Sequence, residues 1–359
     1  MFDHGKCISL DLCASAVMDA MFLQGTQKAK RRGHSLMACG KFSDNDEVNV
    51  LLKSCGILKN LHHPASKAIP PDLLERLRVF ELQDGKKTPV AESSDAELTS
   101  TGLVDFFNSC LGMEGYRLRD EKARNLISLI SEVLGNAEEH SGLEEKDGSA
   151  AWYAIGYHRR SEKPGMGGQC HIVLFNFGIS IFESLARPDT SEDLKRQIRT
   201  LVSEHSEKGF FSRMEDVVWE GILRQRRRIW QEDALWTLYA LQEGVSRFRG
   251  QPDGEDRGNG TVQVIEFFTD LASGAPRMVL VSGRTWILFD GTYRLSNKMR
   301  DGGSRKVIAF NSNNDLMEPP NHNFVRTLDR EFPGTLVSLR FGLRSEDLAR
   351  MQEGVAEND

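Results

Sequence analysis

The segment from Arg119 to His140 constrains the fold of this chain more than any other part of the sequence. Its apolar residues lie at positions 126, 129, 130, 133, 134 and 137. This i, i+3, i+4, i+7, i+8, i+11 spacing is typical of the buried face of an α-helix. We therefore expect a long helix over 119–140 that packs one side against the rest of a folded domain.

Two polar residues border the apolar face of this helix. Glu132 and Asn136 are four residues apart, so their side chains share one face of the helix. The amide oxygen of Asn136 can ligate a hard cation such as Mg²⁺, and the carboxylate of Glu132 can orient or deprotonate a nucleophile. The alternative interpretation is that both are solvated residues of the helix surface.

Strand and helix patterns alternate along the rest of the chain, which predicts an α/β fold. A β-α-β-α unit is expected at the N-terminus, from a strand over 6–12, a helix over 14–31, a strand over 35–39 and a helix over 46–55. Further strands are expected at 77–83, 152–158, 171–177, 278–282, 285–289, 305–310 and 335–342, and further helices at 99–111 and 261–272. Residues 187–256 form a long polar stretch with helical character.

Glycines cluster at three points after the 119–140 helix. The strand over 171–177 ends in Asn176-Phe-Gly178-Ile-Ser180, Arg257-Gly258-Asn-Gly260 directly precedes a helix, and Pro333-Gly334-Thr335 opens a strand. A glycine-rich turn at the start of a helix presents backbone N–H groups and a positive dipole end to phosphate.

In this order, the pieces resemble the four sequence boxes of the GHKL ATPase superfamily, which includes DNA gyrase B subunits, sensor histidine kinases and anti-sigma-factor kinases. Glu132-xxx-Asn136 is similar to the asparagine box, Asn176-Phe-Gly178-Ile-Ser180 to the DxGxG box, Arg257-Gly258-Asn-Gly260 to the second glycine box, and Thr335 follows the glycine of the terminal element. The resemblance covers about 119–343. It implies the Bergerat fold, a layered α/β sandwich.

The resemblance also implies residue roles. Glu132 would polarise the attacking water or hydroxyl, and Asn136 would bind Mg²⁺. Residues 187–256 would be a long helical lid insertion. The residues expected to bind ATP are Asn136, Asn176, Gly178, Ser180, Arg257, Gly258, Gly260 and Thr335.

Two of these positions depart from the family pattern. Asn176 stands where the family has an adenine-reading Asp, and its amide accepts hydrogen bonds only through an uncharged oxygen. Ser180 stands where the family has a second glycine. The changes fit either an active variant or a site that binds nucleotide without turnover, and retention of Glu132 and Asn136 favours activity.

The N-terminal unit resembles a STAS domain, the fold of anti-sigma-factor antagonists. The resemblance covers 6–61 and depends on Ile8-Ser-Leu-Asp11, Val17-Met-Asp19 and Gly56-Ile57. Ala20 stands where an antagonist would have a phosphorylatable serine, so the resemblance implies an interaction or packing module. A generic small α/β unit is the alternative.

Composition excludes several other classes of protein. Lys and Arg number 46 and Asp and Glu 52, so the net charge of −6 argues against a nucleic-acid partner. No apolar run reaches the ~18 residues of a membrane helix, and the N-terminus does not read as a secretory signal. The six cysteines form no CxxC pair, which argues against a zinc site. We expect a cytoplasmic protein without a membrane partner.

The expected organisation is a STAS-like α/β domain over 1–66, a linker and connecting helix over 67–118, a GHKL-like domain over 119–345 and a frayed tail over 346–359. The expected function is an ATP- and Mg²⁺-dependent ATPase that regulates a protein partner, which could be another STAS-type protein, by closing its lid. The alternatives are a catalytically degenerate nucleotide-binding scaffold and an anti-sigma-type protein serine kinase. The sequence leaves the oligomeric state open.

Overall fold

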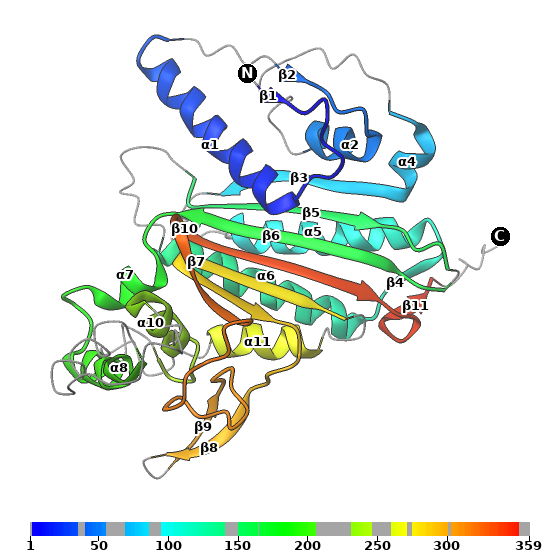
Figure 1. The fold of residues 1–359 in the computed structure, drawn as a ribbon. Coiled ribbons are helices and arrows are strands. Elements are labelled where there is room, and N and C mark those ends of the chain that lie inside the picture. The colour runs from blue at the N-terminus through cyan, green and yellow to red at the C-terminus, as the bar shows by residue number, and fades with distance from the viewer. Residues whose placement is uncertain are drawn as a thin grey trace, which may run out of the picture.

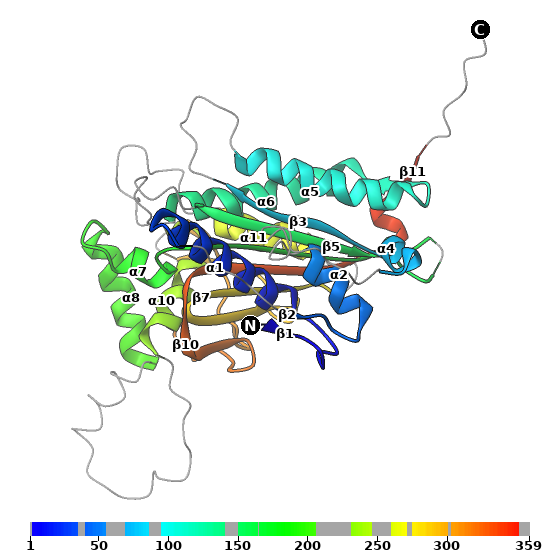
Figure 2. The same ribbon diagram turned by 90° about the horizontal axis from the view of Figure 1, so that it is seen from above.

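The protein is described by a computed structural model (Figures 1 and 2). The structure describes residues 2–34, 40–54, 69–85, 95–140, 150–163, 165–205, 231–245, 260–270, 275–300 and 303–351. Several predicted features lie outside these residues. They are the strand over 35–39, Gly56-Ile57 of the STAS resemblance, 206–230 and 246–256 of the predicted lid, the glycine box residues Arg257 and Gly258, and the tail beyond Met351.

An antiparallel sheet of five strands forms the centre of the molecule. Its order is β3 (Leu77–Gly85), β5 (Trp152–Arg159), β6 (Gly168–Phe177), β10 (Val325–Leu343) and β7 (Arg277–Phe289), and each neighbouring pair is antiparallel. The predicted hairpin is confirmed as β5 and β6. The interior of β6 is buried on both faces, from Cys170 to Asn176, which explains why its central residues 172–175 form a continuous apolar run rather than an alternating pattern.

One face of this sheet is covered by the helices α5 (Asp95–Gly112), α6 (Asp120–His140) and α11 (Gly260–Asp270) (Figure 1). The predicted apolar stripe on α6 is confirmed, because Leu126, Leu129, Ile130 and Leu134 are buried in the larger hydrophobic core. Burying each such side chain stabilises the fold by roughly 1.5–3 kcal/mol. The same stripe therefore fixes which face of α6 turns toward the sheet.

Helix α1 (Leu12–Arg31) lies across the opposite face of the sheet (Figures 1 and 2). Its Leu12, Ala16 and Ala20 share a second hydrophobic cluster with Tyr153 and Phe175 of the central strands. The described part of 1–66 therefore packs directly on the sheet rather than around a separate core. The unit also contains β1 (Phe2–Asp3) and β2 (Gly40–Lys41), which pair in parallel, and α2 (Asp46–Ser54).

The predicted strand over 6–12 is wrong. Residues 4–11 have no regular strand structure, and α1 begins at Leu12. The reason is a helix cap: Asp11 is extended, and its carboxylate accepts a hydrogen bond of 2.9 Å from the N–H of Ala14. The sequence Ser-Leu-Asp-Leu thus signals a helix start as well as a strand.

The predicted linker over 67–118 contributes to the layered domain. After the short α4 (Pro71–Arg76), β3 is an edge strand of the sheet, and α5 packs Leu103 and Phe107 into the main core. β4 (Tyr116–Leu118) pairs with β11 (Leu348–Arg350), so the predicted frayed tail is wrong at these residues. The 3₁₀ turn over Ser345–Asp347 contains the buried Asp347. Its Oδ1 forms a salt bridge of 3.2 Å with Lys122 Nζ of α6.

The described parts of the predicted lid are α8 (Glu192–His205) and α10 (Glu232–Ala240), and α7 (Ile181–Ala186) lies just before them. Leu235 and Leu238 of α10 belong to the main core, and Thr237 is hydrogen-bonded to Thr285 of β7 at 3.2 Å. This part of the insertion is therefore anchored to the sheet. The hairpin of β8 (Ser296–Arg300) and β9 (Gly303–Val307) extends from the same end of the molecule (Figure 1).

The predicted strands at 278–282 and 285–289 are one strand, β7. Gly283 lies in its middle with φ of +55°, and a Cβ there would lie 3.0 Å from the Cβ of Ser180. The glycine therefore permits a local irregularity and a close approach to Ser180 within a continuous strand. Among the described helices, none has the combined length and apolarity that a membrane crossing needs.

Candidate functional site

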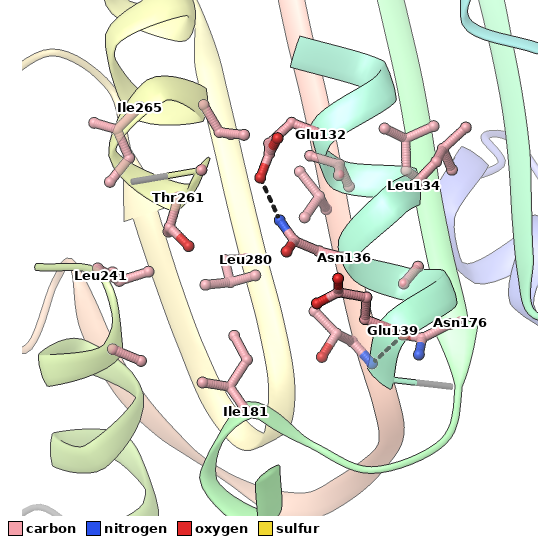
Figure 3. Close-up of a pocket in the computed structure, with 18 of the residues that line it drawn as sticks. Glu132, Leu134, Asn136, Glu139, Asn176, Ile181, Leu241, Thr261, Ile265 and Leu280 are labelled. Atoms are coloured by element: carbon pink, nitrogen blue, oxygen red, sulfur yellow. Dashed lines mark hydrogen bonds between the residues drawn. The ribbon is translucent and has the colours of Figure 1, made fainter. Parts of the chain in front are cut away.

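A cavity of about 460 Å³ lies between α6, the central sheet and the start of α11 (Figure 3). Its walls are mostly apolar, with side chains from the sheet such as Leu174, Leu280 and Val337. Leu241 and Val245, which follow α10, also line it, so the described part of the lid region contributes to its wall. A concave, largely apolar cavity of this size with a few polar groups is the usual form of a small-molecule site.

The predicted pair on α6 lies in this cavity. Glu132 and Asn136 both line it, and the Asn136 Nδ2 donates a hydrogen bond of 3.2 Å to Glu132 Oε1 (Figure 3). This bond fixes the orientation of the Asn136 amide, and its Oδ1 is then the atom that can accept a cation. The i, i+4 spacing of the sequence is thus realised as a direct contact.

Glu132 also meets the start of α11. A Cβ placed on Gly260 would lie 1.6 Å from Glu132 Oε1, so only glycine allows the carboxylate to lie this close to the backbone. The first N–H groups of a helix carry the positive end of its dipole, which favours a carboxylate at this point. Gly260, which belongs to the predicted second glycine box, is therefore in direct contact with Glu132, the predicted general base.

Burial makes Glu132 a better proton acceptor. Desolvation raises its pKa, the hydrogen bond from Asn136 lowers it, and the charge of Glu139 raises it, with a net shift of the pKa upward. A carboxylate whose pKa lies closer to neutrality binds a proton more readily, as a general base must. Glu139 lines the same cavity one turn beyond Asn136.

Asn176 lies at the end of β6, opposite Thr335 at the start of the ladder between β6 and β10. The backbone N–H of Thr335 donates a hydrogen bond of 3.0 Å to Asn176 Oδ1, and both residues line the cavity. The close approach depends on Gly334, which has φ of +134° and whose Cβ would lie 2.1 Å from the carbonyl oxygen of Asn176. Gly334 and Thr335 of the predicted terminal element thus pack against Asn176, which stands at the position predicted to read the nucleobase.

The other half of the Asn176 amide has no partner. The side chain is only 1% exposed, and its Nδ2 makes no hydrogen bond in the described part of the chain. An unpaired buried donor costs about 1–3 kcal/mol, and such groups in native proteins call for an explanation.

A hydroxyl pair supports this wall of the cavity. The hydroxyls of Thr335 and Ser282 are 2.9 Å apart, and the N–H of Ile181 donates to Ser282 Oγ at 2.8 Å. Because Ser282 Oγ accepts the hydrogen bond from the Ile181 N–H, the Ser282 hydroxyl proton is available for donation to Thr335 Oγ1. This network links the strands β7 and β10 to the first residue of α7.

Gly178 and Ser180 do not line the cavity, although the resemblance placed them in the ligand site. Ser180 is the N-cap of α7, where it exchanges hydrogen bonds with Glu183 in a capping box. The N–H of Gly178 donates to the carbonyl of Pro333 at 3.2 Å. Both residues therefore shape the backbone beside Asn176 and lie outside the cavity lining.

The described lining of the cavity holds two carboxylates, Glu132 and Glu139, and no Lys, Arg or His. The described residues also contain no cluster of three or more His, Cys, Asp and Glu side chains that could hold a metal alone. Mg²⁺ does not need such a cluster, since it is commonly bound by one or two protein oxygens together with phosphates and waters. The Asn136 Oδ1, oriented by its bond to Glu132, fits that requirement.

Sequence reasoning missed several polar residues at this site, among them Glu139 in the cavity lining and Ser282 behind Thr335. Glu139 follows Glu132 and Asn136 at i+7 and i+3 spacing, so the helical periodicity that located the pair could have found it. Ser282 carried no such signal, because its role depends on the pairing of β7 with β10 opposite Thr335.

No protein family model, no curated protein and no solved structure matches this chain.

Proposed function

We propose that this protein binds a purine nucleoside triphosphate with Mg²⁺ in the cavity and hydrolyses it, with ATP as the nucleotide that the GHKL resemblance implies. The observation that supports this best is the meeting of Glu132, Asn136 and Gly260 in one cavity. These residues come from the two sequence boxes that carry the chemistry in that superfamily. The two boxes lie far apart in the chain, and the fold brings Glu132 into contact with Gly260.

The base and the phosphates would lie at different ends of the cavity. Leu174, Leu280 and Val337 supply an apolar surface on which a purine can rest, and Asn176 supplies a polar group at its edge. Glu132 and the start of α11 mark the phosphate end. This division is that of nucleotide sites in general, where apolar walls hold the base and backbone N–H groups hold the phosphates.

Glu132 would act as the general base. A water held by its carboxylate loses a proton to Glu132 as the water oxygen bonds to the γ-phosphorus and the bond to the β-γ bridging oxygen breaks. Mg²⁺ at Asn136 would neutralise charge on the phosphate oxygens. The raised pKa of Glu132 favours the proton transfer, and the hydrogen bond from Asn136 keeps the carboxylate in position.

Regulation of a partner would follow from closure over the bound nucleotide. Leu241 and Val245 line the cavity and precede the second glycine box in the chain, so a ligand that contacts them can shift the arrangement of this segment. A nucleotide that binds one arrangement more tightly shifts the population toward it. The expected partner is a protein, of which another STAS-type domain is one candidate.

The Glu132→Gln variant tests the enzymatic proposal. Its Mg²⁺-dependent hydrolysis of nucleoside triphosphate should fall about 10²–10⁴-fold, with calorimetric binding retained. Glu121→Gln is the matched control, because it makes the same change on an exposed residue of the same helix. Unchanged hydrolysis by the Glu132 variant would exclude this residue as the base.

A nucleotide-binding scaffold without turnover is the second candidate. The absence of a basic side chain from the described lining favours it, since neutralisation of phosphate charge there depends on Mg²⁺ and backbone groups. Tight binding of Mg²⁺–nucleotide with no hydrolysis in the native protein would support the scaffold. Transfer of the γ-phosphate to serine of a STAS-type partner would instead support the kinase alternative.

A further inference from the structure

We propose that Lys122 is a positioning residue for Glu132, because it holds the far end of α11 against α6 and thereby sets where the start of α11 meets the Glu132 carboxylate. The inference rests on the proposed function for the role of Glu132 as general base. It adds a residue outside the cavity lining that acts on the site through the packing of two helices.

The helices α6 and α11 lie side by side on one face of the sheet and run in opposite directions (Figures 1 and 2). Lys122 is in the first turn of α6, and its Nζ donates a hydrogen bond to the carbonyl oxygen of Asp270, the last residue of α11. Glu132 lies ten residues further along α6 and meets Gly260, which lies ten residues before Asp270. Both intervals span about 15 Å of helix, so the two contacts belong to one axial register.

The apolar residues between these contacts favour packing without defining the register as sharply. Val264, Ile265 and Phe268 of α11 are buried in the main core. Apolar burial is not directional, whereas a hydrogen bond restricts both distance and angle. Any movement of α11 along α6 changes the close approach of Gly260 to Glu132 Oε1, where a Cβ would lie only 1.6 Å from the oxygen. The polar contact of Lys122 therefore matters for the opposite end of the helix.

The ammonium group of Lys122 is itself held in place. Asp347 Oδ1 forms a salt bridge of 3.2 Å with Lys122 Nζ, and Asp347 Oδ2 accepts a hydrogen bond of 2.9 Å from the N–H of Arg344. The last carbonyl groups of a helix lack partners within the helix and carry the negative end of its dipole, which favours an ammonium group beside Asp270. Lys122 thus joins α6, α11 and the C-terminal turn.

Substitution of Lys122 tests the effect on hydrolysis. Lys122→Met removes the donor and keeps an apolar stem, so Mg²⁺-dependent hydrolysis should fall about 10-fold or more, because a displacement of about 1 Å at a reacting group can cost up to ~10²-fold. Lys122→Arg keeps a cationic donor and should retain most of the activity. Arg124→Met is the matched control, because Arg124 is an exposed residue of the same turn, and its activity should equal that of the native protein.

A double variant tests whether the effect passes through Glu132. In the Glu132→Gln background, Lys122→Met should cause little further loss of hydrolysis, since the group that it positions is already absent. Losses that multiply would show that Lys122 acts on hydrolysis independently of Glu132, and would overturn the inference.

Titration of Glu132 gives a readout that needs no nucleotide. Desolvation is the largest cause of the raised pKa of this carboxyl. Carboxyl-carbon NMR, with the signal assigned by its loss in Glu132→Gln, should show a lower pKa of Glu132 in Lys122→Met than in the native protein, because solvent reaches the displaced carboxylate. Asp347→Asn removes the ion pair and leaves the bond from Lys122 to Asp270. It should lower the free energy of unfolding and leave the pKa of Glu132 unchanged.

The outcomes separate this inference from the proposed function. Absence of hydrolysis by the native protein would overturn the proposed function, and the titration of Glu132 would then decide the positioning role alone. An unchanged pKa of Glu132 in Lys122→Met, or the same change in Asp347→Asn, would overturn the inference. If Lys122→Met does not fold because Asp347 is left as a buried unpaired charge, the combination of Lys122→Met with Asp347→Asn removes that charge. Its Glu132 pKa should lie below that of Asp347→Asn, and equal values would overturn the inference.

Discussion

Gly260 and Glu132 are in such close contact that a methyl group on the Gly260 Cα would lie 1.6 Å from Glu132 Oε1. One residue begins α11, and the other lies in the second half of α6, 128 positions earlier in the chain. The contact joins the start of one helix to a carboxylate on another, at the edge of a cavity. It explains why a glycine is needed at this point.

The Gly260→Ala variant should therefore displace the Glu132 carboxylate. Because the clash is with the end of a flexible side chain, the fold should survive, with a loss of roughly 1–3 kcal/mol in the free energy of unfolding. Hydrolysis should fall as it does in Glu132→Gln. Denaturant unfolding and steady-state turnover measure the two effects.

Gly135→Ala is the matched control for this change. Gly135 lies on α6 within one turn of Glu132 and Asn136, and a Cβ there meets nothing within 4 Å. Alanine in a helix is favoured over glycine by about 0.5–1 kcal/mol, so this variant should be slightly more stable and equally active. Equal behaviour of the two alanine variants would contradict the role given to Gly260.

Glu132 should make the fold less stable as pH rises. Desolvation, with a further contribution from the charge of Glu139, raises the pKa of its carboxyl above the ordinary value of 4.5. The folded state then binds the proton more tightly than the unfolded state, so stability falls as pH increases from 4.5 through the raised pKa. The Glu132→Gln variant should lose this pH dependence of stability. Denaturant unfolding from about pH 4 to 8 measures the free energies of unfolding of the native protein and of the variant. Their difference should shift in favour of the variant as pH rises.

Gly334→Ala should be among the most destabilising single changes at the site. Its φ of +134° is unfavourable for any other residue, and the added Cβ would lie 2.1 Å from the Asn176 carbonyl oxygen. Gly115→Ala separates the two causes, since Gly115 also has a positive φ, +77°, but meets nothing within 4 Å. We expect about 1–2 kcal/mol of backbone strain for Gly115→Ala and clearly more for Gly334→Ala in denaturant titrations.

His171 should act in the opposite direction to Glu132. It is buried on β6, with its Nε2 2.9 Å from Ser338 Oγ. Desolvation first, and then the charge of Arg340, lower its pKa from 6.5 to about 4.

The unfolded chain then takes up a proton between pH 6.5 and about 4 while the folded protein does not, so stability falls as pH falls through this range, by on the order of 2–3 kcal/mol in total. A His171→Gln variant should show a shallower loss of stability between about pH 7 and pH 4.5 in denaturant unfolding. An identical slope for the two proteins would contradict the burial of a neutral histidine.

The helical half of the site was predictable because its information is local. A 3.6-residue periodicity places Leu126, Ile130 and the polar pair on defined faces of one helix, whatever lies around it. The contact of Asn136 with Glu132 follows from their spacing. Glu139 could have been added by the same rule.

The N-terminal segment was less predictable because its signals are ambiguous. A short alternation such as Ile8 to Leu12 fits a strand, but a single hydrogen bond accepted by the Asp11 side chain decides for a helix start. Its packing was not accessible either. The small residues Ala16 and Ala20 indicate that α1 has a buried face, and only the fold shows that this face lies on the central sheet.

Periodicity and spacing along the chain were enough to predict the α6 helix, its buried face and the Glu132–Asn136 pair. Three relationships become evident only in the folded molecule: Gly260 contacts Glu132, Gly334 and Thr335 hold Asn176 in place, and Ser180 caps a helix instead of lining the cavity. The reason is physical. Helical neighbours are set by distance along the chain, whereas strand register, close backbone approach and the partners of a buried amide are set by which distant segments pack together.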